Sequence, residues 1–188
     1  FSTTPTPTVQ VIVQTIPAGL TFSVDNASYS STQMFSWAPG SSHTIATTSP
    51  QSGGSGIRYV WSNWTGGGAI SHAVAPTTNT TYTANFTTQY YLTMAAGTGG
   101  KVSPASGWKN SGSLVSITGT PTNTSLVGYS FAGWAGTGTG SYTGSDNPAS
   151  FTMSGPITET ASFTQNPVNV TVNTSIAGPT FSVDGTSY

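Results

Sequence analysis

The 188-residue sequence contains no cysteine and very little charge. Without cysteine, the chain has neither a disulfide framework nor a thiolate that could serve as a nucleophile or metal ligand. Lys and Arg number three and Asp and Glu four, so charged residues make up 4% of the chain, against about 25% in an ordinary soluble domain. This composition excludes the basic surfaces that bind nucleic acid or an anionic membrane.

Long apolar runs and helical periodicity are also missing. No apolar run approaches the roughly 20 residues of a membrane-spanning helix, so we expect no membrane insertion in this segment. Instead, apolar and polar residues alternate in short stretches such as residues 9–14 and 82–87, between turns rich in Gly, Pro, Ser and Thr. This alternation predicts an all-β fold of small antiparallel modules, either β-sandwich or β-grasp-like.

Thr and Ser are the most abundant residues, with 35 and 28 copies. A chain so rich in hydroxyl groups can be disordered if it lacks apolar area for a core. Here Phe, Trp and Tyr make up 11% of the residues, and Val and Ile recur at strand spacing. We therefore expect a folded protein.

The sequence repeats itself near its two ends. VQVIVQTIPAGLTFSVDNASY at 9–29 aligns with VNVTVNTSIAGPTFSVDGTSY at 168–188, with 13 identities in 21 positions at an offset of 159. In both copies Asp is followed by Asn or Gly, and these residues tolerate the left-handed backbone of a tight hairpin turn. We assign Asp25 to turn formation, and we expect one period of a tandem array plus the start of the next.

A weaker repeat divides this period into two modules. YVWSNW at 59–64 resembles YSFAGW at 129–134, and TANFT at 83–87 resembles TASFT at 160–164. Modules of this size bury a smaller fraction of their surface than larger domains do. Contact between neighbouring modules is therefore expected to contribute to stability.

The expected boundaries follow from these repeats. Module 1 covers residues 9–88 and module 2 covers 89–165. Residues 1–8 hold the end of a preceding repeat and a Pro/Thr linker, and residues 166–188 form the first hairpin of the next repeat. The apolar positions expected to pair with a neighbouring repeat or protomer are Val168, Val170, Val172, Phe181 and Val183.

Module 2 also carries the motifs of a known family. GGKVSPASGW at 99–108, GYSFAGW at 128–134 and TASF at 160–163 place glycine and aromatic residues in a characteristic order. They resemble the divergent internalin-type B-repeat modules of bacterial surface proteins, and the opening of module 1 is similar to PEGA-type surface modules. The resemblance implies an exported, tandemly repeated bacterial protein, secreted or at the cell surface, with small β modules and no catalytic residues.

The ionisable residues do not indicate an enzyme. His43 and His72 lie at alternate positions of predicted strands, and two His without a third nearby ligand do not define a metal site. Ser is abundant, but no glycine-framed Ser follows a strand and precedes a helix, as in one large class of hydrolases. We predict no catalytic residues, no metal site and no cofactor.

The five Trp residues suggest either core packing or carbohydrate-binding platforms. The aromatic positions of YVWSNW recur in YSFAGW, which favours burial in two equivalent cores. Trp37 and Trp108 lie in stretches that resemble loops, Ser-Trp-Ala-Pro-Gly and Ser-Gly-Trp-Lys-Asn. These two residues are therefore the candidate ligand-binding residues.

Seven of the ten Asn residues occupy Asn-X-Ser/Thr sequons. Attached glycans would hydrate a surface that has few charges. Alternatively, Asn and Thr serve only as polar residues on strand exteriors, or O-linked sugar occupies the linker from Thr3 to Thr8. The candidate glycosylation sites are Asn26, Asn63, Asn79, Asn85, Asn123, Asn169 and Asn173.

These features favour a non-catalytic structural repeat unit of an extracellular bacterial stalk, fibre or filament. Uncharged strand edges lack the charges that usually prevent edge-to-edge pairing. We expect neighbouring repeats, or identical protomers, to assemble end to end by strand pairing. The alternative is an adhesin or carbohydrate-binding module that binds glycans through Trp37 or Trp108.

Overall fold

The computed structural model describes residues 7–124, 127–167, 172, 175 and 180–187. Across these ranges the regular structure consists of strands, and no helix is present that could cross a membrane. The strands are β1 (Val9–Ile16), β2 (Phe22–Val24), β3 (Ala27–Tyr29), β4 (Gln33–Trp37), β5 (His43–Thr47), β6 (Gln51–Ser52), β7 (Ile57–Trp64), β8 (Ser71–Val74), β9 (Thr80–Ala96), β10 (Gly100–Ser103), β11 (Gly107–Asn110), β12 (Leu114–Pro121), β13 (Tyr129–Thr137), β14 (Ala149–Thr152), β15 (Ile157–Gln165), β16 (Ser182–Val183) and β17 (Thr186–Ser187).

Module 1 is a sandwich of two β-sheets. In the first sheet, β1 pairs antiparallel with β4 and parallel with the first half of β9, and β9 pairs antiparallel with β7 on its other side. The second sheet has the strand order β3-β2-β5-β8 and is antiparallel throughout. The two sheets face each other across a single core.

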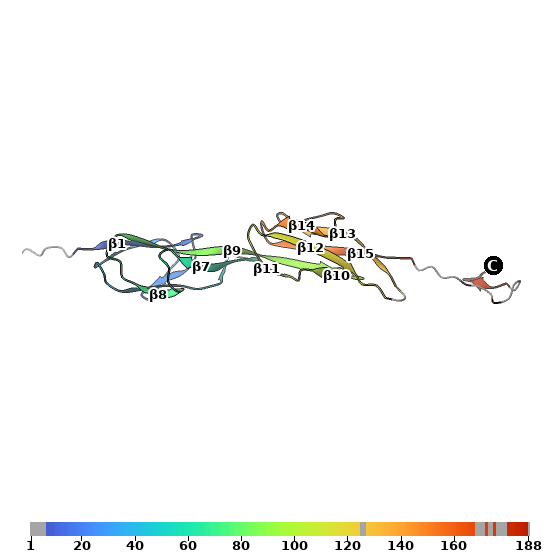
Figure 1. The fold of residues 1–188 in the computed structure, drawn as a ribbon, viewed down its shortest axis with the longest axis horizontal. Helices are drawn as coiled ribbons and strands as arrows, with labels where there is room; N and C mark the ends of the chain where they lie inside the picture. Colours follow the sequence, from blue (N-terminus) through green and yellow to red (C-terminus); the bar gives the residue numbers. More distant parts are fainter. Residues whose placement is uncertain (1–6, 125–126, 168–171, 173–174, 176–179, 188) are drawn as a thin grey trace, which may run out of the picture.

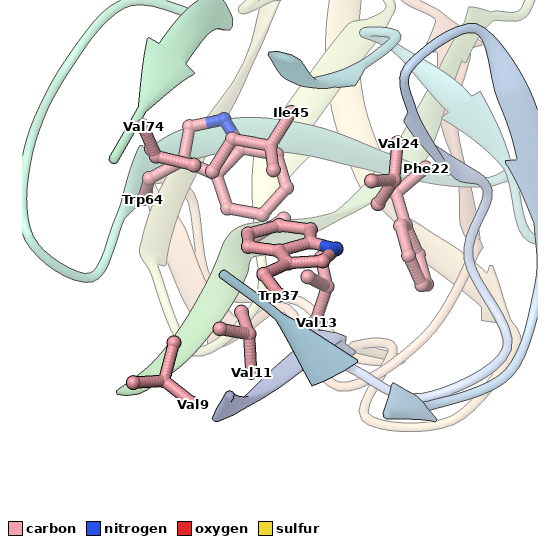
Figure 2. Packing of buried hydrophobic residues seen from close by; sticks show 10 residues of the cluster. Val9, Val11, Val13, Phe22, Val24, Trp37, Ile45, Trp64 and Val74 are labelled. Carbon is pink, nitrogen blue, oxygen red and sulfur yellow. The ribbon is translucent and has the colours of Figure 1, made fainter. Parts of the chain in front are cut away.

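The core of module 1 follows from the alternation in β1. Val9, Val11 and Val13 are buried, whereas Gln10 is exposed between them. Successive side chains of a strand point to opposite faces, so the three valines line the inner face of their sheet. Figure 2 shows the Trp37 ring in the middle of the cluster that these valines form with the second sheet. The other buried members are Phe22, Val24, Ile45, Trp64, Val74 and Ala84.

Module 2 has an equivalent arrangement. Its first sheet contains β11, the second half of β9, β15 and β13 in that order, and β9 and β15 are parallel. Its second sheet has the order β10-β12-β14. The buried core residues are Leu92, Val115, Ile117, Trp134, Ala149, Phe151, Met153, Ile157 and Ala161.

The two modules also match in the detail of their strand pairing. Trp64 lies opposite Ala84 in module 1, and Trp134 lies opposite Ala161 in module 2. In both cases the register shifts just before the Trp, at a β-bulge. Both Trp side chains are buried, as the recurrence of the aromatic positions predicts.

The predicted all-β fold is confirmed, with a difference in strand direction. The modules are not purely antiparallel, because the pairs β1–β9 and β9–β15 are parallel. Parallel neighbours need a long crossover connection, and here the crossover is the remainder of each module. The first and last strands of a module therefore lie side by side.

The hairpin turns have the expected backbone. Asp25 and Asn26 have φ angles of 48° and 69°, and Asp184 and Gly185 have 47° and 80°. These pairs connect β2 to β3 and β16 to β17. Positive φ at both central residues is what a type I′ turn requires, so the assignment of Asp25 to turn formation is confirmed.

Glu159 is a buried carboxyl group in the core of module 2, with no exposed surface. Its Oε1 accepts a hydrogen bond from the Tyr142 N–H at 2.7 Å, and its Oε2 has no partner in the part of the chain that the structure describes. Burial raises the pKa of Glu159, and the hydrogen bond from Tyr142 opposes this shift.

The raised pKa makes stability depend on pH. A carboxyl with a higher pKa in the folded state stabilises the fold below its unfolded pKa, and this contribution is lost as pH rises toward the folded pKa. Glu159→Gln keeps the shape of the side chain and removes its titratable carboxyl group. The variant should therefore be more stable than the wild type at about pH 7, and it should lose less stability between about pH 4 and 7. Urea unfolding at both pH values measures this.

Asp146→Asn is the matched control, because Asp146 is an exposed carboxylate. This variant should show the same pH dependence of the free energy of unfolding as the wild type. If Glu159→Gln and the wild type lost stability equally over this range, the buried carboxyl would not be the cause.

Candidate functional site

The junction between the modules is formed by one strand, β9, which runs through both of them (Figure 1). Along one edge of β9, β7 of module 1 is followed by β15 of module 2. Along the other edge, β1 is followed by β11. Tyr90 lies between Ile57 of β7 and Lys109 of β11. A single eight-stranded sheet therefore continues across the junction.

A loop of module 1 makes a second connection beside this strand. The Gly56 carbonyl accepts a hydrogen bond from the Tyr91 N–H at 2.9 Å. Gly56 has a φ of 70°, and a Cβ atom there would lie 2.8 Å from the side chain of Pro156 in module 2. Glycine is therefore needed both for the left-handed backbone and for the close approach of the two modules.

Trp108 of β11 lies on the outer face of the same junction. Its ring meets Tyr91 edge-on with the ring centroids 5.2 Å apart, and the Arg58 guanidinium carbon lies 4.5 Å from its centroid. Arg58 Nε donates to Gln89 Oε1 at 2.7 Å, and Gln89 Nε2 donates to Asn110 Oδ1 at 2.8 Å. Side chains of module 2 thus hold the guanidinium of module 1 against the indole, a cation–π contact.

Surface hollows border Trp108 on more than one side. A hollow of about 380 Å³ is lined by Trp108 and Tyr91 together with Thr93 and Thr158. A second of about 380 Å³ lies on the side of Arg58, and a third of about 460 Å³ extends along β11 and β12. The first hollow combines two aromatic residues with threonines and has no charged residue in its lining. It therefore suits a neutral polar ligand better than a charged one.

The expectation that Trp37 lies in an exposed loop is wrong. Trp37 is the last residue of β4 and is only 7% exposed. Its ring stacks on Phe35 and on the imidazole of His43, whose centroid is 3.8 Å away. The spacing of two residues between Phe35 and Trp37 was a sign that both face the core. Because its ring is covered, Trp37 offers no platform to a ligand.

Most of the sequon asparagines that the structure describes are accessible. The exposed ones are Asn26, Asn63, Asn79 and Asn123. Asn85 in β9 is half-buried, and its Nδ2 donates to Asn63 Oδ1 at 2.9 Å. Asn169 and Asn173 lie outside the described residues.

The apolar residues expected to pair with a neighbouring repeat are only partly described. Val168 and Val170 lie outside the described residues. Val172 and Val183 are exposed, and Phe181 is half-buried. The hairpin of β16 and β17 therefore leaves apolar surface uncovered.

We did not predict from the sequence that Asp25, His43 and Ser41 form a polar cluster. Asp25 Oδ2 lies 2.7 Å from His43 Nδ1, and His43 Nε2 lies 2.9 Å from Ser41 Oγ. Asp25 Oδ1 accepts a hydrogen bond from the Thr44 N–H at 2.8 Å. The bonds from His43 and Thr44 lower the pKa of Asp25. Pairing of β2 with β5 brings the turn beside His43, and nothing local in the sequence indicates this pairing.

Metal-binding groups do not gather anywhere in the described ranges, where no three His, Cys, Asp or Glu side chains are close enough to hold an ion. The other histidine, His72, contacts the Ala69 carbonyl oxygen through Nδ1 at 2.8 Å.

Comparison with known proteins concerns the second module. Residues 90–167 match the family model of the divergent InlB B-repeat domain. The resemblance carried by the motifs of module 2 is confirmed. The B-repeat family is a family of bacterial surface repeats. Searches of curated proteins and of solved structures found no match. The similarity of the first module to PEGA-type modules stays a prediction.

Proposed function

We propose that the chain is a stiff, non-catalytic structural unit of an extracellular bacterial stalk, fibre or filament. The observation that supports this most is the shared strand β9, which joins two cores without a linker. The match of residues 90–167 to a family of bacterial surface repeats supports a location at the cell surface or outside the cell.

Bending at the junction would be costly for a physical reason. The sheet can bend sharply there only if β9 loses hydrogen bonds to strands of one module. Each such bond contributes roughly 0.5–1.5 kcal/mol net, and several would break together. The packing of Gly56 on Pro156 and of Arg58 on Trp108 opposes the same motion. The pair of modules therefore behaves as one rod.

Along an array, stiff pairs would alternate with looser connections. β9 contains no proline, whereas β15 is followed by Asn166 and Pro167. Proline cannot donate to a strand ladder, so a shared strand cannot continue through it. A period would then consist of modules 9–88 and 89–165, joined to its neighbours by linkers such as residues 1–8. The hairpin of residues 166–188 would begin the next module and pair within it or with another protomer.

The stiffness can be tested with spin labels, because the chain has no cysteine to compete for labelling. Thr32→Cys and Ser145→Cys place exposed labels on the two modules. We expect one narrow distance distribution by pulsed electron paramagnetic resonance. A Gly-Ser-Gly-Ser insertion between Thr88 and Gln89 should broaden it, since the insertion breaks the register of β9.

The same insertion between Gly66 and Gly67 is the control, because that exposed turn lies away from the junction. It should keep the distribution narrow. A broad distribution in the chain without any insertion would contradict a stiff junction.

Attached sugar would supply the hydration that a nearly uncharged surface lacks. Native material from the source organism should carry glycans on the exposed sequons, such as Asn79 and Asn123. Asn85 should remain bare, because it is half-buried and its amide is engaged with Asn63. Mass spectrometry of proteolytic peptides measures the occupancy of each site. Sugar found only between Thr3 and Thr8 would show that the modification is O-linked and not N-linked. Peptides without any sugar would refute glycosylation.

An adhesin that binds neutral polysaccharide is the second candidate function. The hollow that contains Trp108, Tyr91, Thr93 and Thr158 favours it. Trp108→Ala should abolish binding to neutral oligosaccharides on a glycan array. Met34→Ala, which removes an exposed apolar side chain of module 1, should leave binding intact. Binding that survives Trp108→Ala would exclude this site.

A further inference from the structure

Ser41, His43 and Asp25 form one hydrogen-bonded chain at the start of β5. Ser41 Oγ contacts one ring nitrogen of His43 at 2.9 Å, and Asp25 Oδ2 contacts the other at 2.7 Å. This is the order of nucleophile, base and orienting carboxylate that activates a serine hydroxyl, and it is recognised by geometry rather than by sequence position.

Asp25 is the most informative member of this hydrogen-bonded series. Ser and Thr make up a third of the residues, so a hydroxyl group beside a His is expected by chance. Carboxylates are rare, since the chain has four Asp and Glu and two His. The other histidine, His72, contacts a backbone carbonyl oxygen instead. His43 therefore has the carboxylate partner of a Ser-His-Asp arrangement, and His72 does not.

Each group is held in place by a separate contact. Asp25 lies in the left-handed turn, and its Oδ1 is fixed by the Thr44 N–H at 2.8 Å. The His43 ring lies nearly parallel to the buried Trp37 ring, with an interplanar angle of 11°. The imidazole can therefore neither flip nor swing away without losing a hydrogen bond and a stacking contact.

The Ser41 hydroxyl proton has two acceptors within reach. The Ala38 carbonyl oxygen is 2.7 Å from Ser41 Oγ, and His43 Nε2 is 2.9 Å away. When His43 is neutral and Asp25 holds its proton on Nδ1, Nε2 is an acceptor and can take the hydroxyl proton. Ser41 and His43 are half-buried and Asp25 is exposed, so a reagent in solution can approach.

The surroundings limit the chemistry to reactive acyl donors. The Gly40 N–H donates to the Pro76 carbonyl oxygen at 2.8 Å, and the Ser41 N–H donates to the Ala38 carbonyl oxygen at 3.0 Å. These amides are engaged and do not stabilise a tetrahedral oxyanion. An amide would not react without such stabilisation, whereas an activated ester, with a good leaving group, needs less of it.

We propose that Ser41 is an acyl-acceptor site for activated esters, with His43 as its general base and Asp25 as the residue that positions His43. Ser41 Oγ forms a bond to the carbonyl carbon while its proton passes to His43 Nε2. The bond from that carbon to the leaving oxygen then breaks, and the leaving group takes the proton from His43. Ser41 ends as an O-acyl ester, and the donor ends as its free alcohol.

The test uses the full chain and p-nitrophenyl acetate as the probe. Peptide mass spectrometry should find the acetyl group on Ser41 ahead of the other serines, and Ser41→Ala should abolish the fast phase of p-nitrophenol release. His43→Phe keeps a ring against Trp37 but removes the base. It should slow the reaction by roughly 100-fold or more. His72→Phe is the matched control and should keep the wild-type rate.

Asp25→Asn distinguishes positioning from a purely structural role, because Asn also tolerates the left-handed turn. The variant should fold, acylate more slowly and lose the downfield proton resonance of the Asp25-bonded imidazole N–H. Ser41→Ala should keep that resonance. The proposal is overturned if Ser41 reacts no faster than other serines, or if His43→Phe or Asp25→Asn reacts at the wild-type rate.

Discussion

The backbone ladder along β9 is the interaction on which the rest of the structure depends. Ala84 and Leu92 lie on this one strand, and each is fully buried in a different core. Because the alternation of side chains continues unbroken between them, both cores lie on the same side of one sheet. The hollow lined by Trp108 and Tyr91 lies on the opposite side of that strand. Loss of the ladder would therefore uncouple the two cores and also disrupt this hollow.

Several of the few ionisable groups have a local structural role. Arg58 is held against Trp108, and Glu159 is buried in the core of module 2. Asp25 forms a turn and orients His43. Stability depends on two apolar cores and on backbone pairing. Salt weakens surface ion pairs by screening, but it does not weaken these two contributions in that way. The stability of the fold should therefore depend little on ionic strength.

The sequence predicts the features that depend on local chemistry. Alternation and turn residues were sufficient for the all-β fold and for the turn at Asp25 and Asn26. They were not sufficient for the parallel pairing of β1 with β9, because register between distant strands leaves no local mark. The same reason explains the missed contact between Asp25 and His43. The error at Trp37 is different, because its spacing of two residues from Phe35 was a local sign of a shared inner face.

Residual dipolar couplings can decide whether the shared strand makes the two modules one stiff body. Backbone N–H couplings measured in a weakly aligning medium define an alignment tensor for each module separately. We expect tensors of the same magnitude and orientation, because β9 transmits every reorientation of one module to the other. Tensors that differ in magnitude would show that the modules move independently and that the shared strand does not stiffen them.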